Sequence, residues 1–155
     1  MTGAYDTARL KGTNVVNRAD WQKIAEEKLL AAEALLVASQ GPSAYYLAGY
    51  AIECGLKSCV LVRLAGFPEV IFDDKMFSKN CWTHKIEDLV DLAGLKPDRD
   101  AASVATPALA TNWAIVSQWN EETRYQMKTV PEAQALFNAI MDPTHGVMKW
   151  IKARW

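Results

Sequence analysis

Two charged residues stand out in the most apolar part of the chain. Glu53 and Lys57 are four residues apart within the stretch from Ala44 to Ala65. In a helix this spacing puts both side chains on one face, with the glutamate on the favourable N-terminal side. Charged side chains in an apolar helix must be paired with each other or bind a ligand, because burying an unpaired charge is costly. The pair is therefore either a structural ion pair or part of a binding site.

Two further residues could join such a site although they are distant in sequence. His84 lies at the expected start of a helix, and Arg124 lies in a polar segment. Lys57 and Arg124 could bind a phosphate group while Glu53 orients them. We therefore predict a polar groove lined by Glu53, Lys57, His84 and Arg124. The alternative is that these residues are structural, with His84 contacting the first turn of its helix.

The cysteines do not indicate metal or catalytic chemistry. Cys81 lies three residues before His84 without two further ligands in view, so we predict no metal site. Cys54 and Cys59 fall in the apolar stretch, where a free thiol behaves as a small hydrophobe. Three cysteines without C-x-x-C spacing favour a reducing cytoplasm, and no signal-peptide pattern opens the chain. We expect no catalytic cysteine and no cofactor.

Composition indicates one folded domain. Of 155 residues, 50% are hydrophobic and 23% are charged, which is too apolar for a disordered chain. Lysine and arginine number 17 against 18 acidic residues, so no net field attracts nucleic acid, although a local basic face remains possible. The apolar stretch also contains Glu53, Lys57 and Arg63, which favours a buried helix over a membrane span. We expect no membrane partner.

Apolar periodicity predicts an all-α protein. Apolar residues recur at three- and four-residue steps from Asp20 to Ser39, which predicts an amphipathic helix stopped by Gly41-Pro42. Ser43 is expected to cap a second helix that runs to about Ala65 and is apolar on nearly every side. That helix belongs at the centre of a bundle. Residues 67–82 are predicted to form a long loop with one helical turn.

The pattern in the rest of the sequence predicts several shorter helices. They are Lys85 to Ala93, a short helix before Thr106, Pro107 to about Trp119, Pro131 to about Ile140, and Gly146 to Trp155. Residues 120–129 are polar and are expected to form a loop. No segment alternates as a strand would, so we predict an up-down bundle of four to five main helices over residues 18–155, preceded by an N-terminal arm, residues 1–17.

Most aromatic residues are better explained by packing than by stacking on bases. Tyr45, Tyr46, Tyr50, Trp113 and Trp119 could each stack on a base, yet tryptophans in a helical bundle are more often core or interface anchors. The apolar residues that close the chain would be costly to leave exposed. We expect this tail to dock on the bundle or across a dimer.

Four local patterns follow one another in a familiar order. They are Ala44 to Lys57 with its Glu-x-x-x-Lys spacing, Thr83-His84-Lys85-Ile86, Arg124-Tyr125, and a tail from Asp142 to Ile151. Together, along most of residues 21–155, they resemble the HEPN family of small prokaryotic helical proteins. The resemblance implies a HEPN-like bundle that pairs as a homodimer through its long helices. It also adds Tyr125 to the predicted ligand-binding residues.

The resemblance implies three common roles, and the chain departs from the family in one motif. The roles are a metal-independent ribonuclease, a partner of a minimal nucleotidyltransferase, and a nucleotide-binding accessory module; the fold alone does not choose among them. HEPN ribonucleases resemble one another in an Arg-x4-6-His motif, in which Arg stabilises phosphate charge and His moves protons. After Arg124 the corresponding positions hold Thr129, Val130 and Pro131. We therefore do not expect the standard nuclease.

We predict a non-catalytic HEPN-like module that binds a nucleotide, a nucleic acid or a protein partner. It would act with a minimal nucleotidyltransferase or in a toxin-antitoxin pair. Two alternatives stay open. One is a ribonuclease or nucleotide-processing variant that uses Glu53, Lys57, His84 and Arg124 in place of the missing motif. The other is a purely structural helical dimer.

Overall fold

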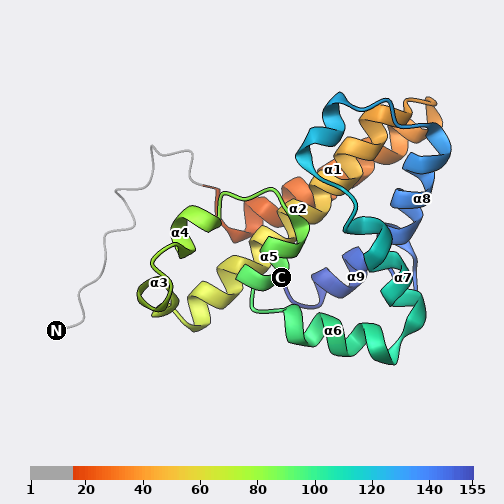
Figure 1. Cartoon of the computed structure of the whole chain (residues 1–155). Coiled ribbons are helices and arrows are strands. Elements are labelled where there is room, and N and C mark those ends of the chain that lie inside the picture. The colour runs from red at the N-terminus through yellow and green to blue at the C-terminus, as the bar shows by residue number, and fades with distance from the viewer. Residues whose placement is uncertain (1–15) are drawn as a thin grey trace.

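The computed structural model describes residues 16–155, and every element in that range is a helix (Figure 1). The predicted N-terminal arm lies outside the described residues except for its last two. The helices are α1 (Arg18–Val37), α2 (Gly41–Gly66), α3 (Val70–Asp73), α4 (Phe77–Asn80), α5 (Ile86–Leu92), α6 (Lys96–Ala105), α7 (Pro107–Val116), the 3-10 helix η2 (Glu121–Tyr125), α8 (Val130–Met141) and α9 (Val147–Lys152). Five of these have ten residues or more, and the prediction of an all-α helical bundle is confirmed.

A tight connection joins α1 to α2. The first helix begins with a capping box, in which the side chain of Asn17 accepts a hydrogen bond from the Asp20 amide and the Asp20 carboxylate accepts one from the Asn17 amide. The chain then turns at Ser39, whose φ is 58°. Gly41 and Pro42 form the first turn of α2, where a proline costs no hydrogen bond. The prediction that they stop the first helix and that Ser43 caps the second is therefore wrong.

The long helix α2 is the centre of the molecule. It packs against α1, α5, η2, α8 and α9, and this explains why its sequence is apolar on nearly every side. Two glycines allow close packing on it. A Cβ at Gly49 would overlap the indole of Trp119, and one at Gly55 would lie 3.0 Å from Cγ2 of Ile151. Gly66, at the end of the helix, has no such neighbour within 4 Å.

The shorter helices close the bundle around α2. Pro97 and Pro107 fall in the first turns of α6 and α7, and Thr129 forms a capping box with Glu132 at the start of α8. Residues 67–82, predicted as a long loop with one helical turn, contain the short helices α3 and α4. Residues 120–129, predicted as a loop, contain η2. The predicted helix to Trp119 ends earlier, at Val116.

The C-terminal tail docks on the bundle. Trp150 and Ile151 of α9 are buried, and the Trp150 ring meets that of Trp113 edge to face at 5.5 Å between centroids. The expected docking of the tail therefore occurs within the chain itself. Across residues 16–155, no helix combines the length and the apolar character needed to cross a bilayer.

Candidate functional site

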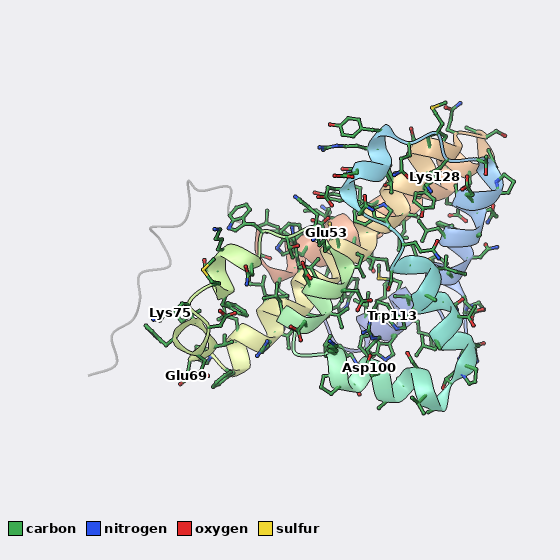
Figure 2. All side chains as sticks on the ribbon, in the orientation of Figure 1. Glu53, Glu69, Lys75, Asp100, Trp113 and Lys128 are labelled. Atoms are coloured by element: carbon green, nitrogen blue, oxygen red, sulfur yellow. The ribbon has the colours of Figure 1, made fainter. Side chains whose placement is uncertain are left out.

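The carboxylate of Glu53 is fully buried and joins two of the other predicted site residues. One of its oxygens, Oε1, accepts a hydrogen bond from Nζ of Lys57 at 2.8 Å and lies 2.9 Å from Nδ1 of His84. Figure 2 shows Glu53 in the middle of the molecule. Three of the residues predicted from the sequence therefore form one cluster, although His84 is distant in sequence from the other two.

The second oxygen of Glu53 is an exception to the rule that buried polar atoms are paired. Among the described residues, Oε2 has no hydrogen-bond partner. A buried acceptor without a donor costs about 1–3 kcal/mol, so such atoms are rare in native proteins and need an explanation. Ser58 Oγ and the indole nitrogens of Trp113, Trp119 and Trp150 also lack a partner within residues 16–155. The unpaired oxygen therefore points to a binding role only together with the contacts of Glu53 to Lys57 and His84.

The two partners of Glu53 connect the buried carboxylate to the surface. The side chain of Lys57 is 13% exposed and that of His84 is 46% exposed. An ionised carboxylate can only accept hydrogen bonds, so in the ionised form of Glu53 this contact is a hydrogen bond donated by Nδ1 of His84. The imidazole is thereby held in one orientation, and its other nitrogen, Nε2, is left to accept from or donate to a ligand.

The first helix contributes two residues that the sequence analysis did not include. Nζ of Lys57 lies 5.1 Å from the ring centre of Trp21, and Nζ of Lys28 lies 5.8 Å from the ring centre of Tyr50. Trp21 and Lys28 are seven residues apart on α1. Their partners on α2, Lys57 and Tyr50, are also seven residues apart, but there the partner of Trp21 comes second in the sequence. Seven residues are close to two helical turns, so each pair shares one face of its helix. That spacing is the signal that could have revealed the α1 side of the site.

The cluster has more basic groups than acidic ones. Burial, followed by the charge of Glu53, raises the pKa of the Cys54 thiol to about 12, while Lys57 and Lys28 act in the opposite direction. Burial also raises the pKa of the Tyr50 phenol. Both groups are therefore neutral at pH 7. Lys57 and His84 contact the single carboxylate of Glu53, and Lys28 on α1 lies near the adjacent Tyr50 and adds a further positive charge to this region.

Two tyrosines continue the site along α2. The rings of Tyr46 and Tyr50 stack with 5.9 Å between centroids and an angle of 15°, and Tyr46 also lies 6.1 Å from Trp119. Both tyrosines are half-buried, whereas Tyr45, Trp113 and Trp119 are buried in the core. The packing interpretation of these three buried aromatics is confirmed. Tyr50, next to Lys28, presents an aromatic edge beside the basic groups.

Arg124 and Tyr125 do not join the cluster. They lie in η2, where the Arg124 guanidinium packs on the Tyr125 ring at 4.8 Å and Tyr125 is largely exposed. Within the described part of the chain, neither residue makes a hydrogen bond or an ion pair with Glu53, Lys57 or His84. Of the predicted groove of Glu53, Lys57, His84 and Arg124, the structure therefore brings the first three residues into contact and gives Arg124 no contact with them.

The described residues contain no group of three or more histidine, cysteine, aspartate or glutamate side chains placed to hold a metal ion. In comparisons with known proteins, no protein-family model, no curated protein and no solved structure matches the chain. The fold and the cluster define the class of protein by themselves. It is an all-helical bundle with a partly buried cluster of Glu53, Lys57 and His84 between α2 and the segment that precedes α5.

Proposed function

We propose that this chain is a non-catalytic, HEPN-like binding module whose site between α1 and α2 holds a nucleotide-like anion. The observation that carries the proposal is the contact of Lys57 and His84 with one buried carboxylate, with Lys28 beside Tyr50 on the same side of α2. The resemblance of the Glu-x-x-x-Lys and Thr-His patterns to the HEPN family supports it, because both patterns fall in this cluster. Fold and pattern alone would not choose a ligand.

The parts of a nucleotide match the parts of the site. A phosphate group would accept hydrogen bonds from Lys57 and would lie beside the imidazole of His84, which Glu53 holds in place. A base would lie against the edge of the stacked Tyr46 and Tyr50 rings, because Tyr46 and Lys28 already lie over the Tyr50 ring. A donor group of the ligand could satisfy Oε2 of Glu53, which has no partner among the described residues.

The test is a calorimetric titration of the pure protein with adenosine monophosphate, inorganic phosphate and a short single-stranded RNA. We expect the nucleotide or the RNA to bind, and Lys57→Ala and Lys28→Ala to weaken binding about tenfold each, as the loss of a charge-assisted contact implies. Lys23→Ala is the matched control, because Lys23 is an exposed lysine of α1 whose recorded ion-pair partner is Glu27. Wild-type protein that binds none of the three probes would overturn the proposal.

A second function is favoured by one specific contact. The 2.9 Å contact between Glu53 and His84 orients a half-exposed imidazole, which is the arrangement of a general base. The chain would then be a ribonuclease or nucleotide-processing variant that replaces the missing Arg-x4-6-His motif. Incubation with total RNA and labelled nucleotides, with and without EDTA, separates the two functions. Turnover lost in His84→Ala supports the enzyme, whereas binding without turnover supports the first proposal.

The protein partners implied by the family resemblance remain predictions. They are a second copy of the chain in a homodimer, a minimal nucleotidyltransferase, and the other member of a toxin-antitoxin pair. Sedimentation velocity on the pure protein distinguishes monomer from dimer. A nucleotidyltransferase encoded beside this chain would favour the second partner, and co-purification of the two proteins would test it.

A further inference from the structure

The connection between α2 and α5 carries an apolar groove. Figure 1 shows α3 and α4 at the end of the molecule opposite α7 and α8, beside the C-terminal half of α2. Here α1, α2, α3, α4 and the residues that follow them enclose a groove of about 700 Å³. Its walls are mostly apolar, and they include Trp21, Leu61, Leu64, Ile71, Phe77 and Trp82.

Two residues that line the groove, Ile71 and Trp82, are exposed, and the connection between α2 and α5 to which they belong, here called the rim, exposes further apolar side chains. Phe72 is 84% exposed and Trp82 is 80% exposed, and Phe67, Ile71 and Met76 are also exposed. Contiguous apolar patches on soluble proteins mark interaction sites, and exposed aromatics are the residues that anchor protein interfaces. A small molecule inside the groove would leave Phe72 in water. The rim therefore fits a larger occupant that covers both the groove and its edge.

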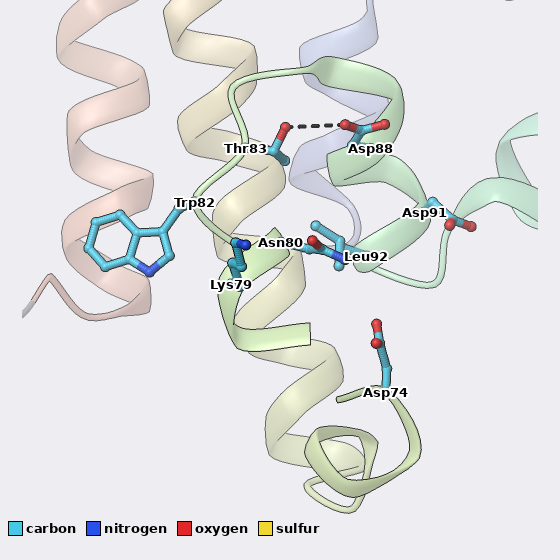
Figure 3. A pocket seen from close by; sticks show the side chains of 8 residues that line it. All are labelled: Asp74, Lys79, Asn80, Trp82, Thr83, Asp88, Asp91 and Leu92. Carbon is cyan, nitrogen blue, oxygen red and sulfur yellow. Dashed lines mark hydrogen bonds between the residues drawn. The ribbon is translucent and has the colours of Figure 1, made fainter. Parts of the chain in front are cut away.

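Trp82 also lines a second hollow, of about 690 Å³, which has the opposite character (Figure 3). Asp74, at the end of α3, and Asp88 and Asp91, on α5, line this hollow together with one basic residue, Lys79. Asp88 accepts a hydrogen bond from the Thr83 hydroxyl at 3.2 Å. Three carboxylates against one amine give the hollow a net negative charge, so it attracts a cation and repels phosphate.

The groove itself has no charge to oppose a basic occupant. Its one charged lining residue is Lys57, whose amino group is already paired with Glu53 at 2.8 Å. An apolar groove and an acidic hollow therefore lie on either side of one exposed tryptophan. An amphipathic helix matches this pattern, because it presents apolar side chains on one face and charged side chains along the edge of that face.

We propose that this surface docks an amphipathic segment of another protein that carries lysine or arginine beside its apolar face. The apolar face covers Trp82 and fills the groove, while the basic side chains enter the hollow of Asp74, Asp88 and Asp91. The docking surface shares Trp21 and Lys57 with the proposed nucleotide site, but the residues that carry the docking proposal, Trp82 and the three aspartates, have no part in binding the nucleotide. The two proposals can therefore fail independently.

The test selects binders from a displayed library of random peptides on the immobilised full-length protein. We expect the enriched peptides to combine apolar residues at helical spacing with lysine or arginine, and to bind with a dissociation constant that rises with salt. Trp82→Ala should weaken the best peptide about 30-fold, as the loss of an interface anchor does. The double variant Asp88→Asn, Asp91→Asn should weaken it several-fold and remove most of the salt dependence.

Two control variants separate this surface from general stickiness. Val104→Ala removes an apolar side chain that is equally exposed on α6, and Glu33→Gln removes a carboxylate on α1; neither residue lines the groove or the hollow. Both variants should bind the selected peptide as wild type does. Because Trp82 is exposed, Trp82→Ala should also melt at the wild-type temperature.

Three results would overturn the proposal. One is enrichment of peptides that lack basic residues or that bind Trp82→Ala unchanged. Another is a dimer that Trp82→Ala dissociates, since the occupant would then be a second copy of the chain. The third is a full-length protein that selects no peptide while a chain beginning at Val16 does, which would assign the groove to residues 1–15 of the same chain.

Discussion

Replacement of Glu53 by glutamine tests whether the buried carboxylate organises the site. The substitution keeps the size of the side chain and one acceptor oxygen, removes the charge, and replaces the other oxygen with an NH2 group that can only donate. A hydrogen bond to a charged group contributes about 1.5–3 kcal/mol. Lys57 is mostly buried, so most of that contribution should be lost, whereas the contact with half-exposed His84 is screened by water and counts for less. We expect a loss of about 1–3 kcal/mol.

For a domain of this size each kcal/mol shifts the melting temperature by about 2–4 °C, so thermal unfolding followed by circular dichroism resolves the effect. A second variant checks the reasoning. Replacing a buried ion pair by apolar residues of similar volume is often neutral or stabilising, whereas removing one partner leaves the other uncompensated. Glu53→Met together with Lys57→Met should therefore be more stable than Glu53→Met alone. Glu53→Gln as stable as wild type, or a double variant less stable than Glu53→Met, would refute this account.

Three further outcomes follow from the packing and the ionisable groups. Gly49→Ala should destabilise the protein by about 1–3 kcal/mol in urea unfolding because its Cβ would overlap Trp119, and Gly66→Ala, which has open space, should not. Hydrogen bonds from Arg99 lower the pKa of the Glu87 carboxyl below its usual 4.5; its stabilisation is therefore complete above that pH and is lost as the pH falls through the lowered value. Glu87→Gln should weaken the pH dependence of urea unfolding between about pH 5 and 3. A thiol reagent at pH 8 should label the native protein first at half-buried Cys81, since burial raises the pKa of all three thiols but raises that of the buried Cys54 and Cys59 to about 12.

The helices could be predicted from the sequence more reliably than their ends. Periodic apolar residues and the uniformly apolar stretch from Ala44 to Ala65 indicated the first helix and the central one, because burial alone determines those patterns. The boundary between them was wrong because proline is compatible with both a stop and a first turn. Ser39, which is not glycine, adopts the left-handed conformation that ends the connection, and nothing in its residue type indicates this.

The contact of His84 with Glu53 was a hypothesis that local sequence could support but not determine. The spacing of Glu53 and Lys57 defines their contact through helical geometry alone. His84, by contrast, reaches Glu53 only because the segment between α2 and α5 returns along the bundle. Arg124 shows the limit of the same reasoning, since its polar neighbourhood resembled a site while its side chain packs on the adjacent Tyr125.

The site and the docking surface meet at a short stretch of the chain. Trp82 belongs to the groove and to the acidic hollow, and His84, two residues later, contacts Glu53. An occupant that covers Trp82 would restrict the backbone that positions His84, so binding at either place should change the affinity at the other. Linkage requires the effect to be reciprocal. Titrating nucleotide in the presence and absence of a selected peptide measures that coupling, and equal affinities in both titrations would show that the two surfaces act independently.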